Sequence, residues 1–262
     1  MKLAISNIAW SEEHDAYMLD IMKKYGFTGL EIAPTRIFKE NPYDALAEKQ
    51  EWEERLWKNN RICVPSMQSI WYGRQERLFG TEEERESLLQ YTKKAIDFAA
   101  SIKCKNLVFG CPKNRNVPDG AQVDCAIPFF YALGEYAVKM GTVIGMEANP
   151  AIYNTNYIND TLSALDLIQQ VKSNGFKLNL DVGTMIQNQE EVSELENRVQ
   201  FINHVHISEP GLKRIEKRHM HEELAELLKK EEYEGYVSIE MGKQEDLAII
   251  EDTMEYVKEI FE

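Results

Sequence analysis

The chain has 262 residues, of which 44% are hydrophobic, and a formal net charge of -14 at pH 7. A chain of this length buries roughly three quarters of the surface that it exposes when unfolded, so its stability requires neither disulfides nor a structural metal. The acidic charge repels phosphate backbones and anionic bilayers. We therefore expect neither a nucleic-acid partner nor a membrane partner.

The four cysteines show no CxxC spacing and no small disulfide-rich context, which is typical of reduced, packing cysteines in a cytosolic protein. The apolar run at residues 1–6 is short and meets acidic residues where a signal-peptide cleavage site would lie. No apolar run approaches the roughly 20 residues that span a bilayer. The sequence predicts a cytoplasmic location and leaves homo-oligomer formation open.

Short apolar and β-branched runs alternate with amphipathic segments along the whole chain. The runs begin near Leu3, Gly29, Arg61, Asn106, Thr142, Leu178, Ile202 and Val237. Such alternation implies parallel strands joined by crossover helices. We predict one α/β domain over residues 1–262 with the (β/α)8 (TIM) barrel fold. The rival architecture, an open doubly wound sheet, is disfavoured because no GxGxxG or GxxxxGK[ST] motif follows a strand.

Capping signals predict several helix boundaries. Ser11 is expected to start the first helix, and Thr81 with Glu84 forms the sequence pattern of a capping box. The Asn-Gly pair ending at Gly175 is expected to close the helix before the sixth strand. The segment Gln187–Glu196 is polar almost all round and predicts a short exposed helix.

The predicted strands five to eight each run from apolar residues into polar ones at the carboxyl end. These ends carry Glu147, Asp181, His206 and Glu240. In a barrel the carboxyl ends of all strands circle one mouth, so the four side chains would converge. Three carboxylates and an imidazole would repel and desolvate one another unless a cation compensated them. The donor set suits one divalent ion, Mn²⁺, Mg²⁺ or Co²⁺, with Zn²⁺ left open.

Each of these residues has a simpler explanation when taken alone. A glutamate at a strand end commonly caps a helix or forms a salt bridge, Asp181 suits a turn, and a strand histidine is usually a hydrogen-bonded core residue. Their joint occurrence at the same end of four consecutive strands favours the metal site.

The segments GFTGLE (26–31), IGMEAN (144–149), LNLDVG (178–183), HVHI (204–207) and SIE (238–240) resemble, in order and spacing, the xylose isomerase-like TIM barrels. That superfamily contains sugar isomerases, sugar epimerases and endonuclease IV. The resemblance implies that Glu147, Asp181, His206 and Glu240 bind the metal, with His204 on the opposite strand face or beside the ligands. It also implies that Glu147 and Glu240 are catalytic proton-transfer groups.

The implied enzyme is a metal-dependent isomerase or epimerase of a sugar, sugar phosphate or sugar acid. One glutamate would take a carbon-bound proton, the metal would stabilise the enediolate, and the other glutamate would return the proton. Two alternatives stay open: a metal-dependent lyase or dehydratase acting on a hydroxy acid, and a barrel that binds a sugar without turning it over.

Three positions depart from the pattern that the ketose 3-epimerases of this superfamily share. Tyr153, Thr184 and Leu212 stand where those enzymes resemble one another in a carboxylate, a histidine and an arginine. The substrate contacts are therefore expected to differ. The His-rich three-zinc cluster of endonuclease IV fits poorly with five histidines in all.

Several further residues are candidates for the substrate site. We predict carbohydrate contacts from Asn7, Gln68, Asn149, Tyr153, His204 and His221. Trp10, Trp71 and Tyr72 are expected either to line the mouth or to plug the barrel. Arg36 and Arg115 would bind a carboxylate or pair with surface acids.

A basic segment follows the seventh strand, at residues 213–221. Phosphate often binds near the loops after strands seven and eight of such barrels, so this segment could hold an anionic substrate. The simpler interpretation, a solvated helix start that balances neighbouring glutamates, is favoured.

Overall fold

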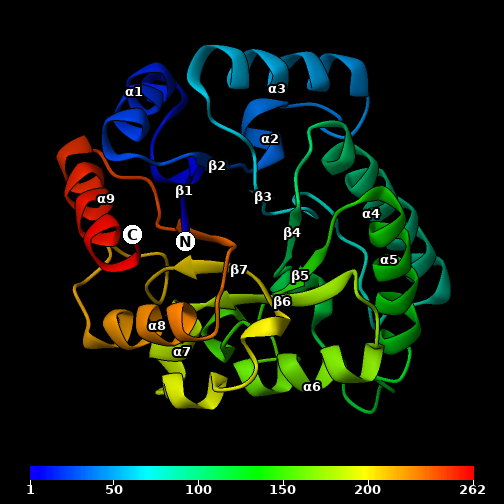
Figure 1. Cartoon of the computed structure of the whole chain (residues 1–262). Coiled ribbons are helices and arrows are strands. Elements are labelled where there is room, and N and C mark those ends of the chain that lie inside the picture. Colours follow the sequence, from blue (N-terminus) through cyan, green and yellow to red (C-terminus); the bar gives the residue numbers. More distant parts are fainter.

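Eight parallel strands form the centre of the molecule, and the computed structural model describes all residues, 1–262. The strands are β1 (Lys2–Ser6), β2 (Gly29–Glu31), β3 (Ser66–Met67), β4 (Asn106–Phe109), β5 (Ile144–Met146), β6 (Phe176–Asp181), β7 (Ile202–Ile207) and β8 (Tyr236–Ile239). Their order is β2-β1-β8-β7-β6-β5-β4-β3. Backbone hydrogen bonds from Leu30 to Cys63 and from Gln68 to Ile32, both 2.9 Å, connect β2 to β3. The predicted (β/α)8 barrel is confirmed (Figure 1).

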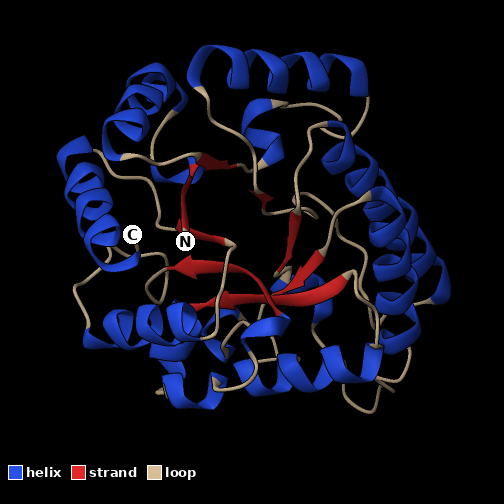
Figure 2. Ribbon diagram, in the orientation of Figure 1, coloured by secondary structure: helices blue, strands red, loops and turns tan.

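Nine α-helices surround the strands (Figure 2). They are α1 (Asp15–Tyr25), α2 (Pro34–Ile37), α3 (Leu46–Asn60), α4 (Glu82–Ser101), α5 (Ala126–Met140), α6 (Thr161–Val171), α7 (Val182–Asn188), α8 (His219–Lys230) and α9 (Leu247–Phe261). Short 3-10 turns η1 to η6 occupy Asn7–Ala9, Glu12–His14, Pro112–Arg115, Ala151–Tyr153, Val192–Leu195 and Val199–Phe201.

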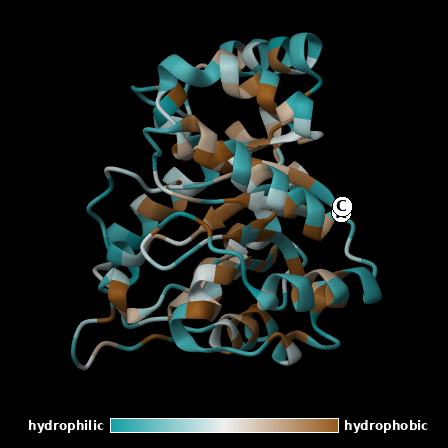
Figure 3. Ribbon diagram, turned by 90° about the vertical axis from the view of Figure 1, so that its left-hand side faces the viewer, coloured by the Kyte–Doolittle hydropathy of each residue, from teal (hydrophilic) through white to brown (hydrophobic).

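The hydrophobic core lies between the strands and the inner faces of these helices. In Figure 3 hydrophobic segments gather in the interior, and hydrophilic ones cover much of the outer surface. The buried apolar side chains form one cluster of 65 residues, as expected for a single barrel core. None of the helices combines the length and apolar character needed to cross a membrane.

The capping box at Thr81 is confirmed: Thr81 Oγ1 accepts the amide of Glu84, and the Glu84 carboxylate accepts the amide of Thr81. Ser11 is different, because its side chain makes no capping hydrogen bond and a 3-10 turn precedes α1. The helix before β6 ends at Val171 with Lys172 in the left-handed region, four residues earlier than the Asn-Gly pair predicted.

Two other predicted boundaries are wrong. The third strand begins at Ser66 rather than near Arg61, because Pro65 has no amide hydrogen and interrupts the ladder. The helix expected at Gln187–Glu196 instead starts directly after β6 as α7, where the Asp181 carboxylate caps the amide of Thr184 at 2.6 Å. The first turn of α7 is buried rather than exposed.

Candidate metal centre

The four residues predicted at the strand ends meet at the mouth of the barrel. One potential ligand atom from each of Glu147, Asp181, His206 and Glu240 lies within 4.8 Å of every other. His206 Nδ1 is 3.1 Å from Glu147 Oε1 and 3.3 Å from Glu240 Oε2. His206 is fully buried, while Glu147 and Glu240 keep less than a tenth of their surface exposed. The barrel therefore brings three carboxylates and one imidazole nitrogen to a single point.

Amide side chains hold the Glu147 carboxylate in place. Asn179 Nδ2 donates to Glu147 Oε1 at 2.9 Å, and Asn149 Nδ2 donates to Glu147 Oε2 at 3.0 Å. Gly110 is needed beside this carboxylate, since a Cβ atom there would lie only 2.7 Å from Glu147 Oε2. Both carboxylate oxygens thus have fixed donors, which orients them toward the centre.

Arg115 stands behind Asn149 and is fully buried. Its Nη2 donates to Asn149 Oδ1 at 2.8 Å, so the amide must present its NH₂ group to Glu147. Burial lowers the pKa of Arg115 to about 10, which still leaves the guanidinium protonated at neutral pH. Arg115 forms no salt bridge and donates to Asn149 instead, so the alternative that it pairs with a surface acid is wrong. Its charge acts on Glu147 through Asn149.

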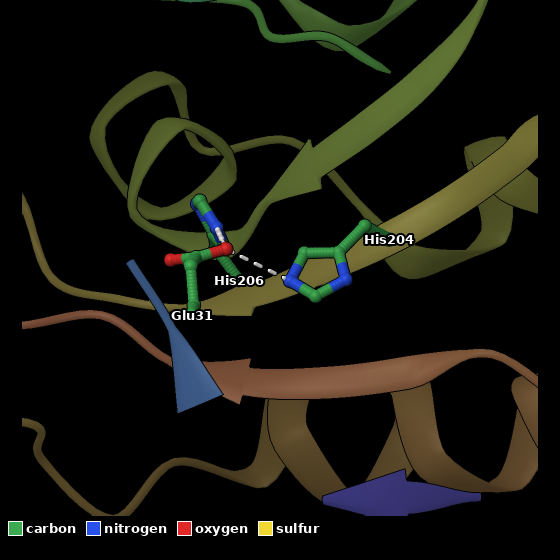
Figure 4. A group of neighbouring side chains, drawn as sticks. All are labelled: Glu31, His204 and His206. Carbon is green, nitrogen blue, oxygen red and sulfur yellow. Dashed lines mark hydrogen bonds and ion pairs between the residues drawn. The ribbon is translucent and has the colours of Figure 1, made fainter. Parts of the chain in front are cut away.

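Glu31 at the end of β2 supports His206 from the other side of its ring (Figure 4). His206 Nε2 lies 2.9 Å from Glu31 Oε2, His204 Nε2 lies 3.0 Å from the same oxygen, and Gln68 Nε2 donates to Glu31 Oε1 at 3.1 Å. A carboxylate only accepts, so Nε2 of His206 carries the hydrogen toward Glu31. The lone pair of neutral His206 is then on Nδ1, facing the three carboxylates.

The electrostatics of the centre are those of crowded anions. Burial and the neighbouring Glu147 raise the pKa of Asp181 to about 6. Burial, with Glu147 and Asp181 beside it, raises the pKa of Glu240 to about 7. Burial alone would lower the pKa of His206, but Glu31 and Glu240 outweigh it and raise that pKa well above its usual value. Without a cation, the cluster holds protons at neutral pH.

This donor set fits a divalent cation. Three oxygens and one imidazole nitrogen suit Mn²⁺, Mg²⁺ or Co²⁺ better than a structural zinc, which favours thiolates. Glu31, His204 and His206 form a second group of potential ligands. Its nitrogens and carboxylate already contact one another in the buried barrel interior, which is the usual arrangement of residues that orient a ligand histidine.

We expect Mn²⁺ to stabilise the protein more at pH 8 than at pH 6. The raised pKa values of Asp181 and Glu240 mean that the metal-free fold binds protons more tightly than the unfolded chain, so that contribution to stability is lost as pH rises through about 6 to 7. A metal ion competes with those protons for the carboxylates, so it binds more tightly at the pH at which they are deprotonated. Thermal melts with Mn²⁺ and with EDTA at both pH values measure the difference, and an equal Mn²⁺-induced shift at both would contradict it.

A cavity of about 170 Å³ opens onto the centre, and we call it the reaction cavity. Three of the predicted substrate-contact residues, Gln68, Asn149 and Tyr153, line it together with Glu147, Asp181, Glu209 and Glu240. Tyr153 Oη accepts the amide of Gly211 at 2.8 Å, which fixes the ring at the rim. These three residues remain candidates for substrate contact.

The other three predicted contact residues lie elsewhere. His221 is buried on α8, with Nδ1 2.9 Å from Tyr256 Oη, and does not line the reaction cavity. Asn7 is buried, accepts the amide of Ala33 and borders a separate cavity beside α1. His204 lies on the same face of β7 as His206, because alternate strand residues share a face. Of the two expected positions, the opposite face is wrong and the position beside the candidate ligands agrees with the structure.

Three basic residues of the segment after β7 pair with acids, whereas Lys213 and Lys217 form no ion pair. Arg218 pairs with Glu209 at 2.7 Å, Arg214 pairs with Asp252, and His219 pairs with Glu222. None of its cations lines the reaction cavity. The simpler interpretation of this segment holds, and an anion site there is not supported.

Two tryptophans pack into the barrel wall, and one of them, Trp71, also borders the cavity next to the reaction cavity. Trp71 is buried and donates to Thr92 Oγ1 at 2.8 Å, and buried Trp10 donates to Asp15. Arg36 pairs with the same Asp15, a partly exposed acid. Tyr72 is 70% exposed and borders a neighbouring cavity.

The nearly closed barrel and the carboxylate–histidine cluster at its mouth define a TIM barrel with a candidate metal centre. The chain belongs to the xylose isomerase-like TIM barrel family, whose profile matches residues 19–260. Comparison with curated proteins gives no match.

Solved structures share the fold at low sequence identity. D-psicose 3-epimerase from Clostridium cellulolyticum H10 superimposes with a TM-score of 0.81 at 17% identity, covering 100% of both chains. The 3-keto-D-glucoside 4-epimerase of E. coli gives 0.78 at 20% identity over 99% of both chains. A probable 3-DHS dehydratase from Bacillus anthracis gives 0.69 at 13% identity, covering 99% of this chain and 98% of that one. At these identities the likeness shows the fold alone.

Proposed function

We propose that this protein is a metal-dependent isomerase or epimerase of a sugar or sugar derivative. The observation that carries the proposal is the pair of carboxylates Glu147 and Glu240, which line one cavity and both approach His206 Nδ1. Two carboxylates at one site allow one to take a carbon-bound proton and the other to return it. The sugar epimerases of the same fold support this reaction class.

A divalent ion bound by Glu147, Asp181, His206 and Glu240 would supply Lewis-acid stabilisation of the enediolate oxygens. The protein residues do the rest. Asn149 and Asn179 keep both oxygens of Glu147 aimed into the cavity, and Glu240 lines the same cavity from the end of β8.

The substrate contacts differ from those implied for free-ketose 3-epimerases. Tyr153 and Leu212, two of the three departing positions, line the reaction cavity. Thr184 turns away, since its hydroxyl donates to the Ala148 carbonyl at 2.8 Å. The cavity therefore presents a phenol and an aliphatic side chain where the resemblance implies a carboxylate and an arginine.

The Mn²⁺-loaded protein should catalyse exchange of one carbon-bound hydrogen of its substrate with solvent. Candidate ketoses, sugar phosphates and sugar acids are incubated in D₂O and followed by NMR. Deuterium at one carbon, with an isomer or epimer formed and no loss of water, is the expected result. EDTA-treated protein is the control and should give no exchange.

Two other results would overturn this assignment. An unsaturated product formed with loss of water would identify a dehydratase, the reaction class of the Bacillus anthracis structure. A protein that binds a sugar, shows the same melting temperature with and without Mn²⁺, and exchanges no hydrogen in any compound would be a binding protein.

A further inference from the structure

A second cavity adjoins the reaction cavity on the side of β3 and β4. It measures about 490 Å³, and we call it the side pocket. The two cavities share Ser69, Cys111 and Pro112, which follow the carboxyl ends of β3 and β4. The reaction cavity alone, at about 170 Å³, is smaller than the roughly 300–1,000 Å³ of ordinary ligand sites. A substrate seated at the metal centre can extend into the side pocket.

The two cavities have opposite charge. Four carboxylates and no cation line the reaction cavity, whereas Arg74, Arg77 and Lys113 and no acid line the side pocket. Arg74 pairs with Glu76, but Arg77 and Lys113 are exposed and form no ion pair. In a chain with a net charge of -14, two unpaired cations in one pocket beside the mouth are a local exception. Such a pocket attracts an anion.

The walls of the side pocket are fixed by the protein itself. Asn114 Nδ2 donates to the carbonyls of Arg74 and Glu76 at 3.1 and 2.8 Å, and the Leu78 amide donates to the Asn114 carbonyl at 2.8 Å. These bonds tie the loop after β3 to the 3-10 turn after β4. The two unpaired cations are therefore carried by loops that already face one another.

We infer that the substrate carries an anionic group, a phosphate or a carboxylate, which binds in the side pocket near Arg77 and Lys113 while the sugar carbons reach the metal centre. This inference rests on the proposed function for the location of the reacting carbons. It places the anion beside β3 and β4 rather than at the basic segment after β7.

Binding of three probes to the Mn²⁺-loaded protein tests the inference: D-fructose, D-fructose 6-phosphate and D-fructuronate, by calorimetry. One or both anionic probes should bind at least about 10-fold tighter than fructose, as expected for about 1.4 kcal/mol. The advantage should shrink in high salt because the cations are exposed. The probe that binds more tightly than fructose shows whether the pocket prefers a phosphate or a carboxylate.

The double variant Arg77→Ala/Lys113→Ala should reduce this advantage to about threefold or less, with Mn²⁺ affinity unchanged. Lys213→Ala is the matched control, since it removes an exposed, unpaired lysine on the β7 side. The inference is wrong if fructose binds as well as both anions, if the double variant keeps the preference, or if Lys213→Ala loses it equally. Because binding is measured without turnover, absence of hydrogen exchange would count against the proposed reaction and leave the anion preference measurable.

Discussion

Replacing Glu240 by Gln should lower interconversion of the substrate by about 10²–10⁴-fold at saturating Mn²⁺, the usual contribution of a positioned acid or base. The same variant should raise the melting temperature of the metal-free protein at pH 8 by a few degrees. Burial and the neighbouring acids raise the pKa of Glu240 to about 7, so its ionised form destabilises the metal-free fold above that pH. A neutral amide removes that charge.

Glu245→Gln is the matched control, because Glu245 follows β8 on the same loop but is exposed and pairs only with Lys243. It should change neither turnover nor Mn²⁺ binding. Product formation by NMR and melting curves with and without Mn²⁺ measure both effects. Full turnover in Glu240→Gln would remove Glu240 from the proton-transfer chemistry, and an unchanged metal-free melting temperature would mean that its charge is already relieved in the fold.

The convergence of the four candidate ligand residues could be predicted from sequence because parallel strands in a barrel obey a simple rule. Apolar residues fill a strand that is buried on both faces, so a polar residue at its carboxyl end marks the mouth. The rule applies to Glu147, Asp181, His206 and Glu240. They are far apart in the sequence, and the barrel brings their side chains together. The positions of these strand ends do not depend on the conformation of any loop.

Glu31 obeys the same rule, in the Gly29–Glu31 strand, but was not proposed as a site residue. Strand β2 has only three residues, so its alternation is too short to stand out. Asn179 could also have been recognised from the sequence, because it is a polar residue two positions before Asp181 in an otherwise apolar stretch. A period of two places it on the same face as Asp181, where it reaches Glu147.

Predictions that depended on loops and helix starts were less successful. The position of His221 relative to the mouth depends on where α8 begins and which face it buries, and the buried face of α8 carries His221 toward Tyr256. For the basic segment after β7 the favoured interpretation holds, but two of its acidic partners come from outside the segment, since Arg218 pairs with Glu209 and Arg214 pairs with Asp252. Side-chain pairing of this kind is a property of the folded surface.

Replacing Glu31 by Gln should weaken Mn²⁺ binding by about 10–100-fold, the usual effect of losing a residue that orients a ligand histidine. Glu31 accepts from His206 and Gln68 and lies 3.0 Å from His204 Nε2, all in the fully buried interior. An amide has one oxygen and one NH₂ group, so it cannot face donors on both sides. If the NH₂ group faces His206, His206 loses the partner that directs Nδ1 toward the carboxylates. If it faces Gln68, His206 keeps only a neutral amide oxygen, which is a weaker acceptor than a carboxylate.

Glu53→Gln separates this effect from the general consequence of neutralising a buried carboxylate. Glu53 on α3 is 3% exposed and accepts from Lys103 Nζ at 2.8 Å, on the outer layer of helices. It should leave the Mn²⁺ dissociation constant unchanged in calorimetry. If Glu31→Gln binds Mn²⁺ as tightly as the unmodified protein, Glu31 does not orient His206. If the unmodified protein binds two ions and Glu31→Gln binds one, Glu31, His204 and His206 are themselves a metal site, because a supporting carboxylate changes affinity and not stoichiometry.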